Sequence, residues 1–433
     1  MVKDRYVARN VFVVDGSRTP FLKARGKPGP FRASDLAVSA ARPLLTRQTF
    51  AATELDEVIV GCIAPGPDEA NIARIIALRL GCGDKVPAWT VQRNCASGLQ
   101  AIDSAALDIA SGRADLVLAG GTESMSHHPI LLNQAMVAWL ADWNRAKSVA
   151  AKSRQLAALR PQHLQLVIAL LRGLTDPLAG LTMGQTAEKL AWRFQIEREA
   201  MDHFAVRSHQ KLTAAIDAGR LDEIEPIYSN NGDLFETDDG LRRDSSVEKL
   251  ANLKPAFDRP VGKVTAGNSA QITDGAAMLL LASEEAVEKH DLPVLGQVID
   301  TQWSALDPTQ MGLGPVHAMG SLLQRQQMDG EAIDYWEINE AFAAQVLACQ
   351  AAWQDQHYMQ QEVGLEQPLS AIPEERLNVD GGAISIGHPV GASGARLVLH
   401  LLKTLQQRGV TRGMASLCIG GGQGGAMLLE VAK

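Results

Sequence analysis

The chain has 433 residues, of which 46% are hydrophobic and 21% are charged, so it can bury more than one domain core and is not a disordered chain. Its formal net charge is -8 and it contains no long basic run, which argues against a nucleic-acid surface. The five cysteines form no CxxC pair, and the start of the chain is charged from Lys3 and has no apolar signal core, so we expect a reducing, cytoplasmic location. The longest apolar runs are far below the roughly 20 residues of a membrane-spanning helix, and we therefore expect no integral membrane span.

Short apolar runs bounded by turn residues alternate with helical patterns in the first third of the chain, which is typical of βα layers. The runs predict buried strands at residues 11–14, 57–63, 88–92 and 115–119. Between the last two runs, apolar residues recur at helical spacing from Leu99 to Ile109, and Gly112 stands where a helix commonly ends.

The last third repeats this layout. It predicts strands at residues 334–338, 379–383, 414–419 and 427–431, and a helix through residues 398–405 that ends at Gly409. The sequences Cys95-Ala96-Ser97-Gly98 and Gly391-Ala392-Ser393-Gly394 each open a helix that leads into an apolar strand ending in glycines. We interpret this as an internal duplication that produces two βα halves facing one another.

The middle of the chain, from about residue 126 to residue 261, has a different character. Helical patterns at residues 139–174 and 186–218 dominate it, and strand-like patterns resume at residues 263–266 and 276–281. We interpret the middle as a large insertion in the first half that covers a site or binds the bulk of a substrate.

Cys95 is the first candidate for chemistry, because it lies between a predicted strand and the start of a helix. The unpaired amides and the dipole at a helix start stabilise a thiolate and are expected to lower the pKa of this thiol. The alternative is a buried cysteine that behaves as a small hydrophobic residue.

Cys418 ends an apolar strand and precedes a glycine-rich run, so backbone and not side chains would line the space beyond it. Gly420, Gly422 and Gly425 match the dinucleotide pattern GxGxxG, but only eight residues follow, too few for a helix and a second strand. A dinucleotide site is therefore excluded here.

Three further polar residues stand at element boundaries. His388 precedes the second helix, and Asn339 with Glu340 follows a predicted strand, the usual place for site residues in α/β folds. The alternatives are a structural histidine and a helix cap with a first-turn acid. Three cysteines are interpreted as packing residues or as a loop residue without partners: Cys62, Cys349 and Cys82. No cluster has metal-ligand spacing, and His127-His128 alone does not indicate a metal site.

Taken together, these motifs resemble the thiolase family over nearly the whole chain. The resemblance is carried by Asp15-Gly16-Ser17-Arg18-Thr19-Pro20-Phe21, Asn94-Cys95-Ala96-Ser97-Gly98, Gly120-Gly121-Thr122-Glu123-Ser124-Met125, Thr265-Ala266-Gly267-Asn268 with Asp274-Gly275-Ala276-Ala277, Asn339-Glu340-Ala341-Phe342-Ala343, Gly387-His388-Pro389, and Cys418-Ile419-Gly420-Gly421-Gly422. It implies an α/β thiolase fold: two duplicated βαβαβ-type halves in a layered α/β/α/β/α core, with a largely helical loop domain. The implied division is residues 1–125 with 263–285 for the N-terminal half, 126–262 for the loop domain that binds CoA, and 286–433 for the C-terminal half.

The family's reaction is acyl exchange between a 3-ketoacyl-CoA and CoA. The resemblance implies that Cys95 is the nucleophile that forms the acyl-enzyme, and that Cys418 is the acid and base. A thiol suits this shuttle because its ordinary pKa, about 8.5, lets it lose and regain a proton near neutrality. His388 and a water held by Asn339 would stabilise the enolate, and the amides of Cys95 and Gly420 would hold the tetrahedral oxyanion. His388 would also help to activate Cys95.

The resemblance also implies that CoA and acyl-CoA are substrates, with no prosthetic group and no metal. Positions that match the family's CoA contacts are Met183, Arg242, Leu253, Phe257, Ala266 and Phe342, and Met311 would line the acyl end. Arg242 is chemically suited to phosphate groups. The expected assembly is a homodimer or homotetramer, with a hydratase/dehydrogenase subunit of a fatty-acid oxidation complex as a further partner.

Two departures bear on the substrate. Short-chain biosynthetic members carry a histidine where this chain has Thr182, and Ser269-Ala270-Gln271 differs from the family's usual pantetheine-contacting segment. The long segment from residue 139 to residue 181 is more similar to degradative members. We therefore expect a degradative 3-ketoacyl-CoA thiolase of β-oxidation, with an acetoacetyl-CoA-forming acetyltransferase as the alternative. A ketoacyl synthase would have a second histidine near Asn339, and a non-catalytic acyl-CoA-binding homologue would have lost catalytic groups that this chain retains.

Overall fold

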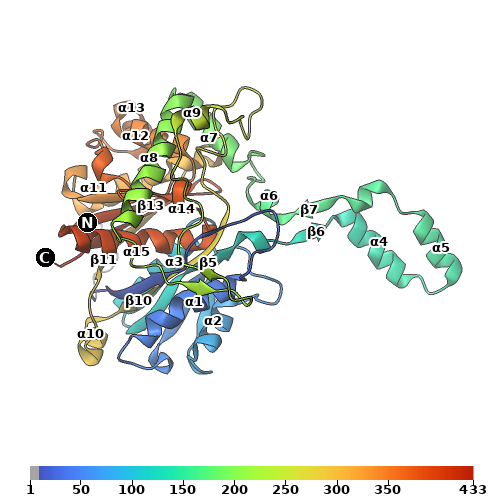
Figure 1. Ribbon diagram of the computed structural model, residues 1–433, viewed down its shortest axis with the longest axis horizontal. Helices are drawn as coiled ribbons and strands as arrows, with labels where there is room; N and C mark the ends of the chain where they lie inside the picture. Colours follow the sequence, from blue (N-terminus) through green and yellow to red (C-terminus); the bar gives the residue numbers. More distant parts are fainter. Residues whose placement is uncertain (1–8, 433) are drawn as a thin grey trace.

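The computed structural model describes residues 9–432, so the charged start used above to predict the absence of a signal segment lies outside the described residues. Ten strands form one sheet through the body of the molecule (Figure 1). Nine follow one another in the order β12 (Tyr335–Ile338), β13 (Arg412–Ile419), β14 (Gln423–Glu430), β11 (Gly296–Ala305), β1 (Phe12–Arg18), β10 (Thr273–Ala282), β5 (Leu116–Ser124), β3 (Glu57–Gly61) and β4 (Ala88–Val91), and the short β2 (Leu22–Lys23) pairs with β10.

Helices cover the sheet in three layers (Figure 1). The central layer is α3 (Ser97–Ala110) and α15 (Val390–Arg408), one outer layer is α1 (Ala33–Thr46) and α2 (Ile72–Leu80), and the other is α11 (Gly314–Gln326) and α12 (Ala343–Gln354). Successive residues of β10 alternate between two cores, as the period of a strand requires. Leu279 and Leu281 pack against the central helices, whereas Met278 and Leu280 pack against α1 and α2.

The predicted α/β/α/β/α layering is confirmed. The strands of the two predicted halves nevertheless form a continuous sheet, because β1 and β11 pair with each other. This junction is short, with only Phe12 opposite Gln297 and Val13 opposite Gly296 in register. The sheet can therefore bend sharply at this point and enclose the two central helices.

The central helices cross where the repeated motifs lie. A Cβ on Gly98 would stand 2.8 Å from the carbonyl oxygen of Gly391, and one on Gly394 would stand 2.5 Å from the amide nitrogen of Leu99. Only glycine fits at such distances. The repeated small residues thus bring the starts of α3 and α15 together, and with them the loops that carry Cys95 and His388.

Most predicted strands of the sheet are confirmed within a few residues, but two predictions are wrong. Residues 379–383 are not a strand, because Asn378 and Gly381 have φ values of 45° and 89°, after which α14 (Ala383–Ile386) begins. Residues 263–266 are a loop whose amides are bonded to side chains: Lys263 and Val264 donate to the carboxylate of Glu188.

The middle of the chain contains two antiparallel strand pairs, β6 (Ile130–Leu132) with β7 (Leu166–Ile168) and β8 (Ile227–Tyr228) with β9 (Leu234–Phe235), and several helices. The helices are α4 (Gln134–Arg145), α5 (Val149–Ala157), α6 (Ala169–Gly173), α7 (Met183–Arg193), α8 (Arg198–Asp217) and α9 (Val247–Ala251). The continuous helical stretch predicted at residues 139–174 is wrong, since Leu166–Ile168 pairs with Ile130–Leu132. The helices predicted at residues 186–218 are confirmed.

The segment from β6 to α6 projects from the body as an arm (Figure 1). The remaining short helices are α10 (Glu284–His290) and α13 (Gln356–Tyr358). Among residues 9–432, no helix is both long enough and apolar enough to cross a bilayer. The division of the chain at residues 125, 262 and 285 stays a prediction.

Candidate active site

Cys95 lies in the loop between β4 and α3, and this loop is fixed by its own side chains. Asn94 has a φ of 44°, in the left-handed region that asparagine tolerates better than most residues. The hydroxyl of Ser97 accepts the amide of Arg93 at 2.9 Å and donates to the carbonyl of Asn94 at 2.8 Å. The loop therefore holds Cys95 half-buried at the start of α3, as the sequence predicts.

The sulfur of Cys95 faces two backbone amides. The N–H groups of Gly420 and of Cys95 itself donate to it and favour the thiolate, but burial outweighs them, and the pKa of this thiol is raised above its ordinary value. The expectation that the helix start lowers the pKa of Cys95 is wrong for this state of the enzyme. The pKa of Cys95 is raised because burial removes its sulfur from water, and this burial depends on the segments that pack around the loop. A proton acceptor is therefore required to form the thiolate.

Gly420 stands in the turn between β13 and β14. The side-chain amide of Asn94 donates to its carbonyl at 2.8 Å, so the Cys95 loop and this turn are joined directly. Gly421 and Gly422 have φ values of 92° and 77°, and a Cβ on Gly420 would stand 3.3 Å from the sulfur of Met183. The glycine run thus combines a tight turn with close approach to the insertion.

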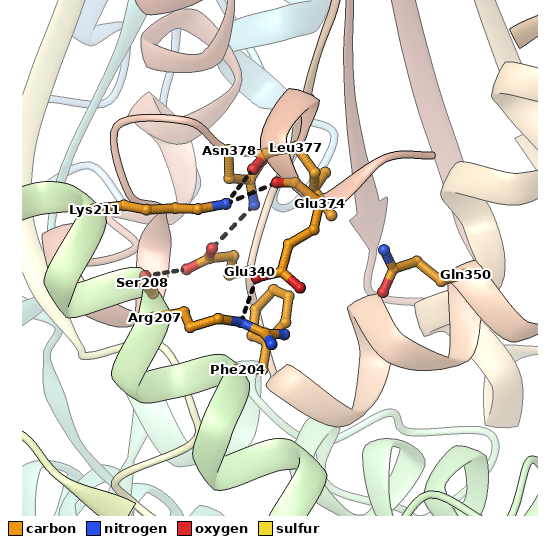
Figure 2. Close-up of a pocket in the computed structure, with 9 residues that line it drawn as sticks. All are labelled: Phe204, Arg207, Ser208, Lys211, Glu340, Gln350, Glu374, Leu377 and Asn378. Carbon is orange, nitrogen blue, oxygen red and sulfur yellow. Dashed lines mark hydrogen bonds and ion pairs between the residues drawn. The ribbon is translucent and has the colours of Figure 1, made fainter. Parts of the chain in front are cut away.

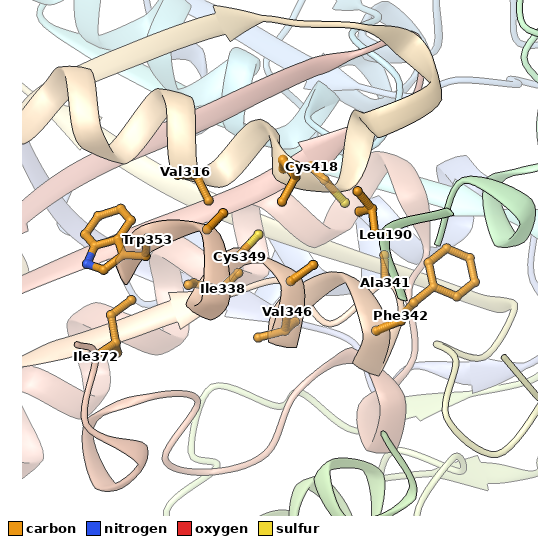
Figure 3. Close-up of a cluster of buried hydrophobic side chains, with 14 of the residues drawn as sticks. Leu190, Val316, Ile338, Ala341, Phe342, Val346, Cys349, Trp353, Ile372 and Cys418 are labelled. Atoms are coloured by element: carbon orange, nitrogen blue, oxygen red, sulfur yellow. The ribbon is translucent and has the colours of Figure 1, made fainter. Parts of the chain in front are cut away.

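Cys418, at the end of β13, is 1% exposed and lies in the apolar cluster shown in Figure 3. Burial raises the pKa of its thiol well above the ordinary value, and a negative charge on Cys95 or Cys349 raises it further. The expected titration near neutrality is therefore wrong for the free enzyme, in which Cys418 holds its proton. Cys418 lies two residues before Gly420, whose carbonyl is bonded to Asn94, so the segments that carry Cys418 and Cys95 adjoin.

His388 lies between α14 and α15, where Gly387 has a φ of 119°. Its Nδ1 is 2.6 Å from the hydroxyl oxygen of Ser393, and its Nε2 is buried without a partner among the described residues. Burial, together with the charge of Arg396, lowers the pKa of His388 to about 4. The imidazole is therefore neutral near pH 7.

Asn339 follows β12, and its amide continues the pairing with β13 by donating to the carbonyl of Ser416 at 2.9 Å. Both polar atoms of its side chain are buried and have no partner among the residues from 9 to 432. An unpaired buried amide is costly unless a water or a ligand satisfies it. Because β12 and β13 are neighbours, Asn339 lies beside the strand end that carries Cys418.

Two family models match the chain: "Thiolase, N-terminal domain" at residues 11–285 and "Thiolase, C-terminal domain" at residues 292–431. The chain belongs to the thiolase family. A curated relative, the mitochondrial trifunctional enzyme subunit beta of Bos taurus, is 36% identical over 423 residues, with 98% of this chain and 88% of the relative covered.

Two solved structures extend the similarity to the whole thiolase fold. The Bacillus anthracis acetyl-CoA acetyltransferase has a TM-score of 0.83 and 36% identity, covering 98% of this chain and 99% of that chain. The human mitochondrial 3-ketoacyl-CoA thiolase in complex with CoA has a TM-score of 0.83 and 34% identity, with the same coverages.

The predicted substrate contacts of this thiolase fall into two groups. Met183 and Phe257 pack against the cluster that contains Cys418, and Phe342 is buried within it. The rings of Phe257 and Phe342 are 5.9 Å apart, edge to face. Met311 is buried in the same cluster. Three others are exposed: Arg242, Leu253 and Ala266. Their roles toward CoA stay predictions.

Two side chains that position the site had no role assigned from the sequence. Ser393 contacts His388. The alternative of a helix cap at Asn339 with Glu340 as a first-turn acid is wrong, since α12 begins at Ala343 with Phe342 as its cap. Glu340 lies instead beside a polar cavity of about 40 Å³, too small for an acyl-CoA (Figure 2). Its carboxylate accepts hydrogen bonds from Ser208, Asn378 and the amide of Ile384. Only the tertiary structure brings these donors together.

The remaining cysteines are buried and unbonded to one another. Cys62 and Cys82 pack in the core under α1 and α2. The prediction that Cys62 and Cys349 are packing residues is confirmed, and Cys82 is a packing residue as well, although it lies in a loop.

Proposed function

We propose that this thiolase cleaves 3-ketoacyl-CoA with CoA, releasing acetyl-CoA and a shortened acyl-CoA through an acyl-enzyme on Cys95. The observation that carries the proposal is the amide of Gly420 directed at the sulfur of Cys95 from the turn that follows Cys418. It is supported by the electrostatic coupling of the two thiols and by the unpartnered buried polar atoms of His388 and Asn339. This arrangement matches the needs of a reaction that passes through two kinds of oxyanion and transfers protons in each half-reaction.

In the first half-reaction, a neutral His388 accepts the proton of Cys95. The hydroxyl of Ser393 donates to the carbonyl of Pro389 at 3.1 Å, so its oxygen is left to accept Nδ1–H of His388. The lone pair of Nε2 then faces the site as the proton acceptor. The thiolate attacks the 3-keto carbon, and the C2–C3 electron pair passes into the enolate of acetyl-CoA. Cys418 donates its proton to that enolate.

The electrostatic coupling between the thiols of Cys95 and Cys418 sets the order of the two half-reactions. A negative charge on Cys95 raises the pKa of Cys418, so Cys418 keeps its proton until the enolate takes it. Acylation removes the charge of Cys95 and with it this repulsion. The Cys418 thiolate can then persist until it takes the proton of incoming CoA. The CoA sulfur attacks the thioester, and the Cys95 thiolate leaves and takes its proton back from His388.

The oxyanions are matched by donors of two kinds. The amides of Cys95 and Gly420 that face the sulfur are within reach of a carbonyl oxygen built on it. The protonated Nε2 of His388 and a water held by the side chain of Asn339 stabilise the enolate. Each preorganised donor of this type contributes on the order of 10²–10³ in rate.

The expected substrates account for the surroundings of the site. Apolar side chains at Met183, Met311, Phe257 and Phe342 suit the pantetheine and the acyl chain, and the exposed Arg242 suits phosphates. A human relative binds CoA in its crystal structure, and the bovine relative is a subunit of a trifunctional enzyme. A homodimer or homotetramer, a hydratase/dehydrogenase partner, a cytoplasmic location and the lack of a prosthetic group stay predictions.

Mass spectrometry after incubation with acetyl-CoA tests the central step. The wild type gains one acetyl group, Cys95→Ala gains none and loses thiolysis of acetoacetyl-CoA, and the control Cys82→Ala behaves as the wild type. Normal turnover by Cys95→Ala would contradict the proposal. Cys418→Ser slows both half-reactions, so acylation at the wild-type rate in that variant would contradict its role.

A second candidate, an acetyl-CoA acetyltransferase restricted to four carbons, is favoured by the similarity to the Bacillus anthracis enzyme. A series of 3-ketoacyl-CoA esters of increasing length separates the two. Rising kcat/KM with chain length supports the degradative enzyme, and activity confined to acetoacetyl-CoA supports the acetyltransferase.

A further inference from the structure

The two side chains proposed to stabilise the enolate lie on different elements. His388 precedes α15, and its Nδ1 is 2.6 Å from the hydroxyl oxygen of Ser393 on that helix. Asn339 follows β12, and its amide donates to the carbonyl of Ser416 at 2.9 Å. These hydrogen bonds hold each donor on its own element, but they do not set the distance between the helix and the strand.

A buried ion pair joins this helix to this strand. Nη1 of Arg396, on α15, is 2.9 Å from Oε2 of Glu337, on β12, and both side chains are 2% exposed. Arg396 lies three residues after Ser393, so the two share one face of the helix. Glu337 lies two residues before Asn339, so the two point to the same side of the extended strand. The ion pair therefore joins the two faces that hold the enolate donors.

The charge of Arg396 reaches the candidate active site as well. Burial lowers the pKa of His388 to about 4, and the charge of Arg396 contributes to this shift. Burial raises the pKa of Glu337, and the same charge opposes that rise. Arg396 is thus close enough to act on both the imidazole and the strand.

Stability alone does not account for a buried ion pair at this place. Removing two charges from water costs about as much as their attraction returns, and apolar replacements of similar volume are often neutral or stabilising. A charge-assisted hydrogen bond differs from an apolar contact because it fixes both a distance and a direction. The pair of Arg396 and Glu337 is therefore better suited to alignment than to stabilisation.

We propose that Arg396 and Glu337 are positioning residues that hold His388 and Asn339 at the separation required by the enolate. This role rests on the proposed function, in which the enolate of acetyl-CoA forms when the C2–C3 bond breaks. A displacement of about 1 Å between groups of this kind costs about 10²-fold in rate.

The second kind of oxyanion does not depend on this ion pair. In the proposed function, the amides of Cys95 and Gly420 hold the tetrahedral oxyanion, and neither residue lies on α15 or β12. Loss of the ion pair should therefore impair enolate formation and leave acyl transfer largely intact.

Two assays with acetyl-CoA separate these steps. Incorporation of deuterium into its methyl group in D₂O requires the enolate, whereas transfer of its acetyl group to labelled CoA passes through Cys95 without an enolate. The double variant with Arg396→Met and Glu337→Leu removes both charges at once. We expect its methyl exchange and its kcat for acetoacetyl-CoA thiolysis to fall about 100-fold. Its KM and its acetyl transfer should stay close to the wild-type values.

Two lysine variants give a matched comparison. Arg396→Lys keeps the charge but loses the planar fork of donors, so its methyl exchange should fall less than in the double variant and still more than its acetyl transfer. Arg325→Lys makes the same change in a largely buried ion pair with Asp300 at 2.7 Å, which joins α11 to β11. This control should lower the melting temperature without changing the ratio of the two rates.

The ratio of the two rates decides the outcome. Equal losses of methyl exchange and acetyl transfer in the double variant would assign the ion pair to folding alone and overturn the proposal, as would wild-type rates in both assays. If the double variant does not fold, the same criterion applies to Arg396→Lys measured against Arg325→Lys. A wild-type protein that performs neither reaction would refute the proposed function, and the positioning role with it.

Discussion

Glu340→Gln should weaken catalysis without touching a reacting atom. In the wild type, one carboxylate oxygen accepts from the Ser208 hydroxyl at 2.7 Å and from the Ile384 amide at 3.2 Å, and the other accepts from the Asn378 side chain at 3.0 Å. A glutamine has one oxygen and one NH₂ group in place of the two carboxylate oxygens. In either orientation its NH₂ group faces another hydrogen-bond donor, so at least one of these hydrogen bonds is lost. The bonds lost are charge-assisted and worth about 1.5–3 kcal/mol each.

Part of this loss is offset, because burial raises the pKa of Glu340 and a neutral amide avoids that desolvation cost. We therefore expect the free energy of unfolding to fall by about 2 kcal/mol. The effect on activity arises because two of the groups that donate to Glu340 lie close in the chain or in space to His388 and Asn339. Ile384 lies four residues before His388, and Asn378 bonds both backbone groups of Ile338, the residue before Asn339. A displacement of about 1 Å at such groups costs about 10²-fold in rate.

Urea unfolding and the pH profile of kcat/KM for acetoacetyl-CoA thiolysis check this prediction. The matched control is Glu374→Gln on the wall of the same cavity, where an exposed ion pair with Arg207 at 2.9 Å contributes less than about 1 kcal/mol (Figure 2). If Glu340→Gln unfolds and turns over like the control, the carboxylate does not position the site. A drop in stability with an unchanged kcat would restrict Glu340 to a structural role.

Three further predictions concern ionisation and packing. Because burial raises the pKa of Cys95, its alkylation by iodoacetamide should accelerate about tenfold per pH unit between about pH 6 and 8, and a rate independent of pH would show a preformed thiolate. Although burial opposes its charge, Glu223 and Asp380 raise the pKa of His400 to about 10. We expect His400→Leu to lower the free energy of unfolding by about 3–5 kcal/mol. This difference from the wild type should be complete below about pH 6.5 and decline as the pH rises through about 10. Thermal unfolding across this range measures it, and a difference that grows with pH would contradict the assignment. Gly98→Val should prevent α3 and α15 from crossing and yield misfolded or inactive protein, whereas Gly81→Val at an open surface turn should cost stability only.

The sequence predicts where the proposed catalytic groups lie in the fold better than it predicts their ionisation. Cys95, Cys418, His388 and Asn339 are recognisable because each stands where a strand or a helix begins or ends, and such boundaries depend on local patterns. The pKa values of the two thiols were misjudged because they depend on burial by segments far along the chain. The same limit explains why Glu340 resembles the first-turn acid of a helix, since two of its partners, Ser208 and Asn378, come from distant parts of the fold.

Local patterns also failed where side chains replace backbone partners. Residues 263–266 have a strand-like composition, but the carboxylate of Glu188 satisfies the amides that a neighbouring strand would have bonded. In the arm, helical spacing conceals a hairpin, because the pairing of Leu166–Ile168 with Ile130–Leu132 joins segments more than thirty residues apart. Both errors concern contacts that no short window of sequence contains.

The duplicated architecture explains why the reaction can use two thiols at one point. The first half supplies Cys95 at the start of α3, and the second supplies Cys418 and the amide of Gly420 at the end of β13. Asn94 joins the two by its bond to the carbonyl of Gly420, so the proposed nucleophile and its proposed amide donor come from opposite halves. Replacing Asn94 with alanine should therefore loosen this junction and reduce the rate of acylation more than substrate binding. If kcat is unchanged and KM rises instead, the bond serves substrate binding and the halves are aligned by the glycine crossing alone.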